Sequence, residues 1–181
     1  MLVRPAALQD IPAIHSIYAY HVLHGLASFE EEPPPVEEMR RRFEDVTGRG
    51  LPYLAAEESG EVLGYGYCAP YRARSAYRYA LEDSVYIRDG RQGKGIGKAL
   101  LAELIRICQG LNYRQIIAVI GDSANLPSIA LHASLGFVRA GNLRSTGYKF
   151  GRWVDSVLMQ RPIGGGDMTP PKGAMGDGSK P

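Results

Sequence analysis

Residues 84–101 constrain the fold most, because a short apolar strand, a basic glycine-rich turn and a helix follow one another there. Val85, Tyr86 and Ile87 are strand formers, and the apolar spacing from Leu100 onward fits one face of an α-helix. The turn therefore lies at a helix N-terminus. Free backbone N–H groups and the positive end of the helix dipole meet there, which favours a phosphate-bearing ligand.

Glycines and basic side chains define the chemistry of this turn. The glycines would let the main chain approach a ligand without an intervening Cβ: Gly93, Gly95 and Gly97. The basic side chains supply mobile positive charge: Arg91, Lys94 and Lys98. Together they indicate a pyrophosphate site.

Two common phosphate-binding loops do not match this turn. A Walker loop needs an earlier glycine and a following Ser or Thr, whereas Gln92 and Ala99 hold those positions around the Gly-Lys pair. A dinucleotide fingerprint needs its third glycine where Lys98 stands, and an early strand before it. The pattern that does match is Gln-x-x-Gly-x-Gly, formed by Gln92, Gly95 and Gly97.

This loop resembles the acyl-CoA loop of the GCN5-related N-acetyltransferases, the GNAT family. From the loop alone, an ordinary strand-to-helix turn stays an open interpretation. The resemblance implies acetyl-CoA as acetyl donor and no metal. The cofactor-binding residues that it implies are Val85, Tyr86, Ile87, Gln92, Gly93, Lys94, Gly95, Ile96, Gly97, Lys98, Asn125 and Ser128.

Length and composition favour one globular domain. The chain has 181 residues, 45% of them hydrophobic and 22% charged, with a formal net charge of +2. The basic run at 40–42 follows acidic residues at 30–32 and 37–38, so a solvated helix face is favoured over a nucleic-acid surface. No transmembrane-length apolar run or signal peptide is apparent, so we expect a cytoplasmic protein without a membrane partner.

Cysteines and histidines give little support for a disulfide or a metal site. Cys68 and Cys108 fall in apolar segments and are expected to be reduced core thiols. His15, His21 and His24 share one predicted helix, but no Cys or carboxylate completes a ligand set. We expect neutral or surface histidines.

The remaining chain predicts an α/β fold with a mixed sheet in one domain over residues 1–162. Helices are expected near residues 11–24, 36–48, 96–111 and 127–135. Strands are expected near residues 2–4, 53–57, 62–68, 79–87, 115–120, 137–138, 147–150 and 153–159, with 115–120 central and buried on both faces. Residues 163–181 are rich in Gly and Pro and are expected to form a disordered tail. This order of elements is also that of the GNAT fold.

Further motifs narrow the resemblance to the phosphinothricin and methionine sulfone/sulfoximine N-acetyltransferases. The matching segments are 71–74, 82–87, 118–121, 131–137 and 149–155. The most discriminating is Lys149-x-Gly-x-Trp-x-Asp155. The resemblance implies a small amino acid as acceptor and a homodimer.

Acetyl transfer to an amine needs a base, fixed donors for the carbonyl oxygen and a proton for the departing thiolate. By resemblance, Glu82 is the base, acting directly or through water. A carboxylate paired with a nearby arginine is the competing interpretation. Asp83 should point to the opposite face of the sheet, which makes it the weaker candidate.

The donors and the acid follow from the resemblance in the same way. Backbone N–H groups from Val85 to Ile87 would polarise the thioester carbonyl. His132 stands where the family's usual general acid, a tyrosine, is found, and it could either donate a proton or only pack. Asn125 could contact cofactor or serve only as a helix N-cap.

The acceptor would be recognised by charge and by aromatic walls. Arg72 and Arg74 could hold an α-carboxylate, because a guanidinium fork matches that group. Phe29, Tyr86 and Trp153 could wall the side-chain pocket, although each could also be core. A protein or peptide acceptor, or a non-catalytic acetyl-CoA-binding module, are the alternative functions.

Overall fold

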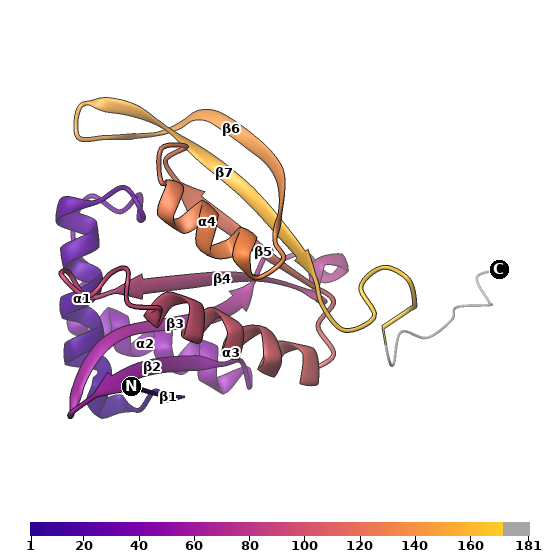
Figure 1. The fold of residues 1–181 in the computed structure, drawn as a ribbon, viewed down its shortest axis with the longest axis horizontal. Helices are drawn as coiled ribbons and strands as arrows, with labels where there is room; N and C mark the ends of the chain where they lie inside the picture. Colours follow the sequence, from indigo (N-terminus) through magenta and orange to yellow (C-terminus); the bar gives the residue numbers. More distant parts are fainter. Residues whose placement is uncertain (172–181) are drawn as a thin grey trace.

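In a computed structural model, residues 1–171 are described, and a seven-stranded sheet forms their centre (Figure 1). The strands are β1 (Leu2–Pro5), β2 (Tyr53–Glu58), β3 (Glu61–Pro70), β4 (Ala80–Ile87), β5 (Gln115–Gly121), β6 (Val138–Lys149) and β7 (Arg152–Pro162). The helices are α1 (Ile11–His24), α2 (Val36–Gly48), α3 (Ile96–Gly110) and α4 (Leu126–Ser134), with short 3-10 turns at Leu8–Asp10 and Ser75–Tyr77. The predicted order of elements is confirmed.

One predicted boundary differs near the C-terminal end of the sheet. Residues 137–138 and 147–150 were expected to be separate strands, but residues 138–149 form the single strand β6. Its register against β7 shifts between Arg139 and Gly141 and again between Leu143 and Gly147. Such irregularities hide the alternating pattern from the sequence, because extra residues in one strand interrupt the two-residue period.

The strand order is β1-β2-β3-β4-β5-β7-β6, and every neighbouring pair is antiparallel except β4 and β5. This parallel pair runs from Ala80 opposite Gln115 to Asp83 opposite Ala118. Beyond that point the two strands continue, to Ile87 and Gly121, without pairing with each other. A gap therefore opens in the middle of the sheet.

The helices cover the two faces of the sheet in pairs. On one face, Tyr18 of α1 meets the ring of Tyr86 edge-on at a centroid distance of 5.1 Å. On the other face, α3 lies so close to β3 that a Cβ at Gly66 would come within 3.2 Å of Leu104. Leu100, Leu101 and Leu104 are fully buried, which stabilises the fold by roughly 1.5–3 kcal/mol each. Figure 1 shows α3 and α4 together on one side of β4 and β5.

The C-terminal segment differs from the expected tail over its first residues. Ile163 is 2% exposed and belongs to the core, and its N–H donates to the carbonyl oxygen of Arg114. The Arg114 guanidinium in turn donates to the carbonyl oxygens of Thr169 and Pro170 at 3.1 and 2.6 Å. The expectation of disorder from residue 163 is therefore wrong for residues 163–171. Residues 172–181 of that predicted tail lie outside the described part of the chain.

Helices that could cross a membrane, by length and apolar character, are not found within residues 1–171.

Candidate active site

The gap between β4 and β5 contains a small cavity of about 50 Å³. Its walls are the start of α4 and the ends of β4 and β5 that do not pair with each other, with Ala27 at one side. The cavity arises because hydrogen bonding between the parallel strands stops at Asp83 and Ala118. Larger pockets lie on both sides of it, and both share lining residues with it.

The pocket on the α3 and α4 face has a volume of about 370 Å³. Most of the predicted cofactor-binding residues line it: Val85, Ile87, Gln92, Gly93, Gly95, Ile96, Gly97, Lys98, Asn125 and Ser128. Tyr86 and Lys94 are not among its lining residues, and Tyr86 lines the cavities at the gap and on the opposite face instead. We call this hollow the cofactor pocket.

The glycine-rich turn takes the shape that the sequence predicts. Gly93 and Gly95 have φ values of +75° and +80°, a region that residues with a Cβ rarely adopt. Helix α3 begins at Ile96, so its first N–H groups have no partner within the helix and face the pocket region. A Cβ at Gly97 would lie 3.1 Å from Leu131, so this glycine lets α4 approach α3 closely. The turn is built to accept an anion through its main chain.

His21 is a lining residue that the sequence analysis missed. Its Nε2 lies 2.8 Å from the carbonyl oxygen of Ile87, and its ring is 5.5 Å from that of Tyr86. Ala27, Arg91, Pro127 and Leu131 complete the pocket. His21 was expected only to be a neutral or surface histidine of the predicted helix, because its partner lies on β4, far away in the sequence.

Asn125 is the predicted N-cap of α4, and its contact with cofactor stays a prediction. Its side-chain oxygen accepts a hydrogen bond from the Ser128 N–H at 3.2 Å, which makes it the N-cap of α4. The same residue also lines the cofactor pocket and the gap.

The pocket on the α1 and α2 face has a volume of about 280 Å³, and we call it the acceptor pocket. Its lining residues come from β3, β4, β5, β7 and the segment after α1: Ala27, Ser28, Phe29, Tyr67, Glu82, Ser84, Tyr86, Val119, Gly121 and Ser156. Residues 115–120 were predicted to be buried on both faces of the sheet. Val119 is partly exposed, so that prediction is wrong at this end of β5. Tyr67, Ser84 and Ser156 were not predicted, since nothing in their spacing marks them.

Glu82 lies on the acceptor side of the gap, where its carboxylate is partly removed from water. Loss of solvation raises the pKa of Glu82, and the nearby charge of Asp83 raises it further, while Arg72 acts in the opposite direction. The competing arginine pair does not form among the described residues, since Arg72 lies 5.1 Å above the Tyr71 ring and Arg78 donates to the Ser75 carbonyl. The pKa of Glu82 is thus shifted upward, which is the direction that favours a carboxylate as a proton acceptor.

Asp83 and His132 form a buried pair beneath the gap. Asp83 points to the face opposite Glu82, as predicted, and its Oδ2 lies 3.0 Å from His132 Nε2. His132 Nδ1 lies 2.7 Å from the Ser128 carbonyl oxygen and must donate to it, because a carbonyl can only accept. Burial lowers the pKa of His132, but the hydrogen bond and charge of Asp83 outweigh burial, so the pKa is raised above its ordinary value.

The predicted acceptor residues are only partly brought together. Phe29 and Tyr86 line the acceptor pocket. Arg72 and Arg74 are exposed beside the 3-10 turn at residues 75–77 and do not line it. Trp153 is 64% exposed on β7, where it meets Tyr148 at 5.2 Å, so the structure does not bring it to this pocket.

Within residues 1–171, no group of three or more His, Cys, Asp or Glu side chains is placed to hold a metal ion. Cys68 and Cys108 are both buried and unbridged.

Comparison with known proteins identifies relatives along nearly the whole chain. The family profile described as "Acetyltransferase (GNAT) domain" matches residues 3–158. A phosphinothricin N-acetyltransferase from Alcaligenes faecalis is 56% identical over 170 residues, covering 94% of this chain and 86% of the relative. An L-methionine sulfoximine/L-methionine sulfone acetyltransferase from Pseudomonas aeruginosa is 37% identical over 159 residues, covering 87% and 92%. The crystal structure of a phosphinothricin acetyltransferase from Sinorhizobium meliloti in complex with acetyl-CoA matches with a TM-score of 0.92 and 48% identity, covering 96% and 94%.

Proposed function

This chain belongs to the GNAT family of N-acetyltransferases, and we propose that it acetylates the α-amino group of a small amino acid, with Glu82 as general base. Acetyl-CoA is the acetyl donor of the family. The proposed acceptors are L-methionine sulfone, L-methionine sulfoximine and phosphinothricin. Relatives named for the sulfoximine, the sulfone and phosphinothricin support this choice. We propose a cytoplasmic location and a role in detoxifying such amino acids.

One observation carries the proposal: pockets on opposite faces of the sheet meet at the gap between β4 and β5. Val85, Asn125 and Ser128 line both the cofactor pocket and the gap. Ser84, Tyr86 and Val119 line both the gap and the acceptor pocket. A donor held on the α3 face can thus present its reactive end to an amine on the α1 face.

The residues present fit acetyl-CoA. The N-terminus of α3 and the glycine-rich turn suit a diphosphate, and Arg91 and Lys98 add positive charge. Beyond Asp83, the β4 backbone has no β5 partner, so its polar groups are available on that side to a ligand in the gap. When bound, acetyl-CoA supplies the activated acetyl thioester.

Glu82 would take a proton from the substrate ammonium, directly or through water, so that nitrogen gains the lone pair needed for attack. Its raised pKa supports this role, because a stronger base removes an ammonium proton more readily. Backbone N–H groups at Val85 to Ile87 would stabilise negative charge on the carbonyl oxygen.

His132 would supply the proton to the departing thiolate in this proposal. Both ring nitrogens have partners, Nδ1 with the Ser128 carbonyl and Nε2 with Asp83, so the Nε2 proton would have to leave Asp83 to reach the thiolate. The raised pKa of His132 supports an imidazolium that has this proton to give.

Acceptor recognition combines aromatic contact with positive charge. Phe29 and Tyr86 would contact the side chain of the amino acid. Arg72 and Arg74 would attract its α-carboxylate, and the effect of Arg72 on the pKa of Glu82 indicates that its charge reaches the pocket. The volume of this pocket, about 280 Å³, suits a single amino acid.

We also propose a homodimer formed through the β6–β7 hairpin. Apolar side chains are exposed along this hairpin: Val138, Leu143, Tyr148, Phe150 and Trp153. Several large apolar side chains exposed on one hairpin, with Tyr148 and Trp153 in contact, are typical of an interaction site. Trp153 would then serve the interface rather than the acceptor pocket of its own chain.

The substrate class is tested by measuring CoA release from acetyl-CoA with methionine sulfone, methionine sulfoximine, phosphinothricin and one short peptide. We expect saturable turnover with at least one of the three amino acids and far lower kcat/KM with the peptide. Preference for the peptide would overturn the acceptor assignment. Protein that binds acetyl-CoA in calorimetry but turns over none of these compounds would support a non-catalytic module.

A further inference from the structure

Residues 25–35 connect α1 to α2 and lie over the acceptor pocket, and we call them the cover segment. Ala27, Ser28 and Phe29 of this segment line the pocket. The segment contains no helix or strand, so its backbone is not fixed by a ladder or helix of its own. Its position must come from contacts with other parts of the chain.

Lys149 makes the deepest of these contacts. It is the last residue of β6, is 2% exposed, and belongs to the Lys-x-Gly-x-Trp-x-Asp motif. Its Nζ donates to the carbonyl oxygens of Gly25 and Ser28 at 3.0 and 2.8 Å. A buried ammonium is tolerated only when it is hydrogen-bonded, so this side chain and the two carbonyls depend on one another.

Two glycines let the cover segment sit close to the sheet. A Cβ at Gly147 of β6 would come within 2.6 Å of the Phe29 ring. A Cβ at Gly121, the last residue of β5, would overlap the carbonyl oxygen of Leu26. The pocket wall therefore packs against β5 and β6. Lys149 holds the backbone at Gly25 and Ser28, the residues on either side of Leu26 and Ala27.

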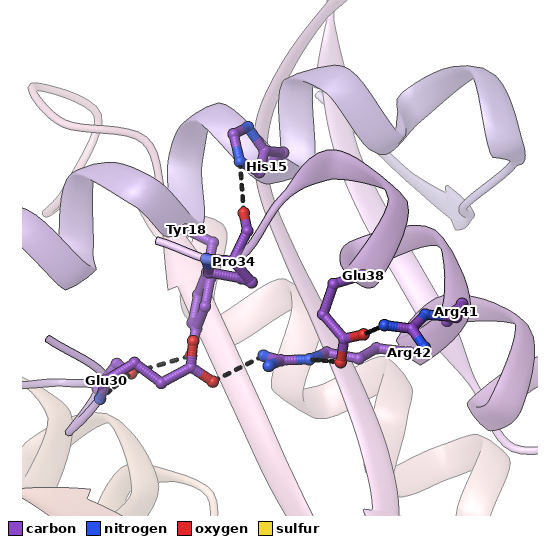
Figure 2. Close-up of polar contacts among 8 residues, drawn as sticks. His15, Tyr18, Glu30, Pro34, Glu38, Arg41 and Arg42 are labelled. Carbon is purple, nitrogen blue, oxygen red and sulfur yellow. Dashed lines mark hydrogen bonds and ion pairs between the residues drawn. The ribbon is translucent and has the colours of Figure 1, made fainter. Parts of the chain in front are cut away.

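The outer side of the cover segment is held by more exposed contacts, which Figure 2 shows. The Arg42 guanidinium of α2 donates to Glu30 at 2.8 Å and to Glu38 at 2.9 Å. His15 Nε2 of α1 lies 2.9 Å from the Pro34 carbonyl oxygen. Ion pairs that are open to water contribute little individually. The buried contacts of the segment are those of Lys149 and the hydrogen bond of 2.9 Å between Tyr18 Oη and Ser28 Oγ, so Lys149 is the charged anchor on the pocket side.

We propose that Lys149 is a positioning residue that fixes the cover segment as a wall of the acceptor pocket, so that it controls acceptor binding rather than acetyl-CoA binding. This inference rests on the proposed function, because the pocket is assigned to the acceptor there. Lys149 needs no contact with substrate for this role. Its ammonium acts through the carbonyls of Gly25 and Ser28 and thereby through the side chains of Ser28 and Phe29, which line the acceptor pocket but not the cofactor pocket.

The test replaces Lys149 with methionine. Methionine keeps a long unbranched side chain and removes the N–H donors of the ammonium. For Lys149→Met we expect the acceptor KM to rise about ten-fold or more, since hydrogen bonds from a charged group hold the wall in place. The acetyl-CoA dissociation constant should stay within about two-fold of wild type, because the glycine-rich turn does not contact Lys149. Arg106→Met, which removes an exposed charge paired with Glu103 on α3, is the matched control and should change neither value.

Hydrogen exchange provides a readout that does not depend on any acceptor. Amides of residues 25–32 should exchange faster in Lys149→Met than in wild type, while those of α3 stay unchanged. If wild type turns over none of the amino acids, the proposed function is wrong. The exchange result then still tests whether Lys149 holds the cover segment in place. Unchanged exchange at residues 25–32, or an acceptor KM equal to wild type, would overturn the inference.

A second variant keeps the test valid if Lys149→Met does not fold. Gly147→Ala leaves Lys149 in place and displaces the Phe29 ring, so the acceptor KM should rise with little change in acetyl-CoA affinity. A normal acceptor KM in Gly147→Ala would show that the wall position does not matter and would also contradict the inference.

Discussion

Glu82 and Asp83 are neighbours on β4 whose carboxylates lie on opposite faces of the sheet. Glu82 lines the acceptor pocket, while Asp83 is buried against His132 on the α4 side. Strand geometry alone produces this separation, because consecutive side chains point to opposite faces. One carboxylate can therefore act as a base while the next raises the pKa of a histidine and so favours its charged form.

Replacing Asp83 with asparagine should destabilise the protein in a pH-dependent way. The folded-state pKa of His132 lies above its ordinary value of 6.5, so this pair contributes stability fully below pH 6.5 and loses it as pH rises through the folded pKa. We expect Asp83→Asn to lower the free energy of unfolding by about 3 kcal/mol below pH 6.5, and by less at pH 9. Urea unfolding at a series of pH values measures the difference, and a pH-independent gap between the two proteins would contradict it.

At the scale of elements, the site depends on how α3 begins and on where the pairing of β4 with β5 ends. Left-handed backbone at Gly93 and Gly95 turns the chain so that the N-terminus of α3 faces the cofactor pocket. The end of pairing at Asp83 opens the gap that joins this pocket to the acceptor side. Helix and strand positions, more than any one side chain, bring donor and acceptor together.

Gly95→Ala should weaken acetyl-CoA binding more than it weakens folding. A Cβ at a φ of +80° costs about 1–2 kcal/mol, which the turn can relieve by moving its N–H groups away from the diphosphate. We expect calorimetry to show an acetyl-CoA dissociation constant raised about ten-fold. Gly110→Ala, at the open end of the same helix, is the control and should bind normally. Equal affinity in both variants would show that the turn is not the phosphate site.

At the scale of the molecule, the features that could be predicted from the sequence are those that depend on the local pattern of apolar and polar residues. The order of elements, the glycine-rich turn and the opposite orientations of Glu82 and Asp83 follow from periods of two and of 3.6 residues. The Asp83–His132 pair, the contact of His21 with Ile87 and the Lys149 anchor could not be predicted. Each joins residues far apart in the sequence, so only the packed fold shows them.

The predictions that differ from the structure also depend on contacts between residues far apart in the sequence. Ile163 was assigned to a tail because the residues after it are mostly Gly and Pro, but its own side chain fills the core beside Arg114. Trp153 was considered as a wall of the acceptor pocket or as part of the core, yet its side chain is exposed on the hairpin. A single exposed residue of this size points to an interface only when its neighbours on β6 and β7 are known.

The dimer proposal belongs to this largest scale. Trp153→Arg should shift the protein from dimer to monomer, because it places a charge among the exposed apolar side chains near the tip of the hairpin. Light scattering after size exclusion measures the mass. Leu2→Arg, at a residue 60% exposed on the opposite edge strand, is the control and should keep the mass of wild type. Wild type that elutes as a monomer would contradict the dimer.

The most direct test of the central claim is the turnover of Glu82→Gln alongside its affinity for acetyl-CoA. Because the raised pKa of Glu82 means that its charge costs stability above pH 4.5, the amide variant should unfold at a temperature no lower than that of wild type at pH 7. With methionine sulfoximine as acceptor, kcat/KM should fall about 100-fold or more, while calorimetry gives an unchanged acetyl-CoA dissociation constant. Full turnover by folded Glu82→Gln would show that another group removes the proton and would contradict the account.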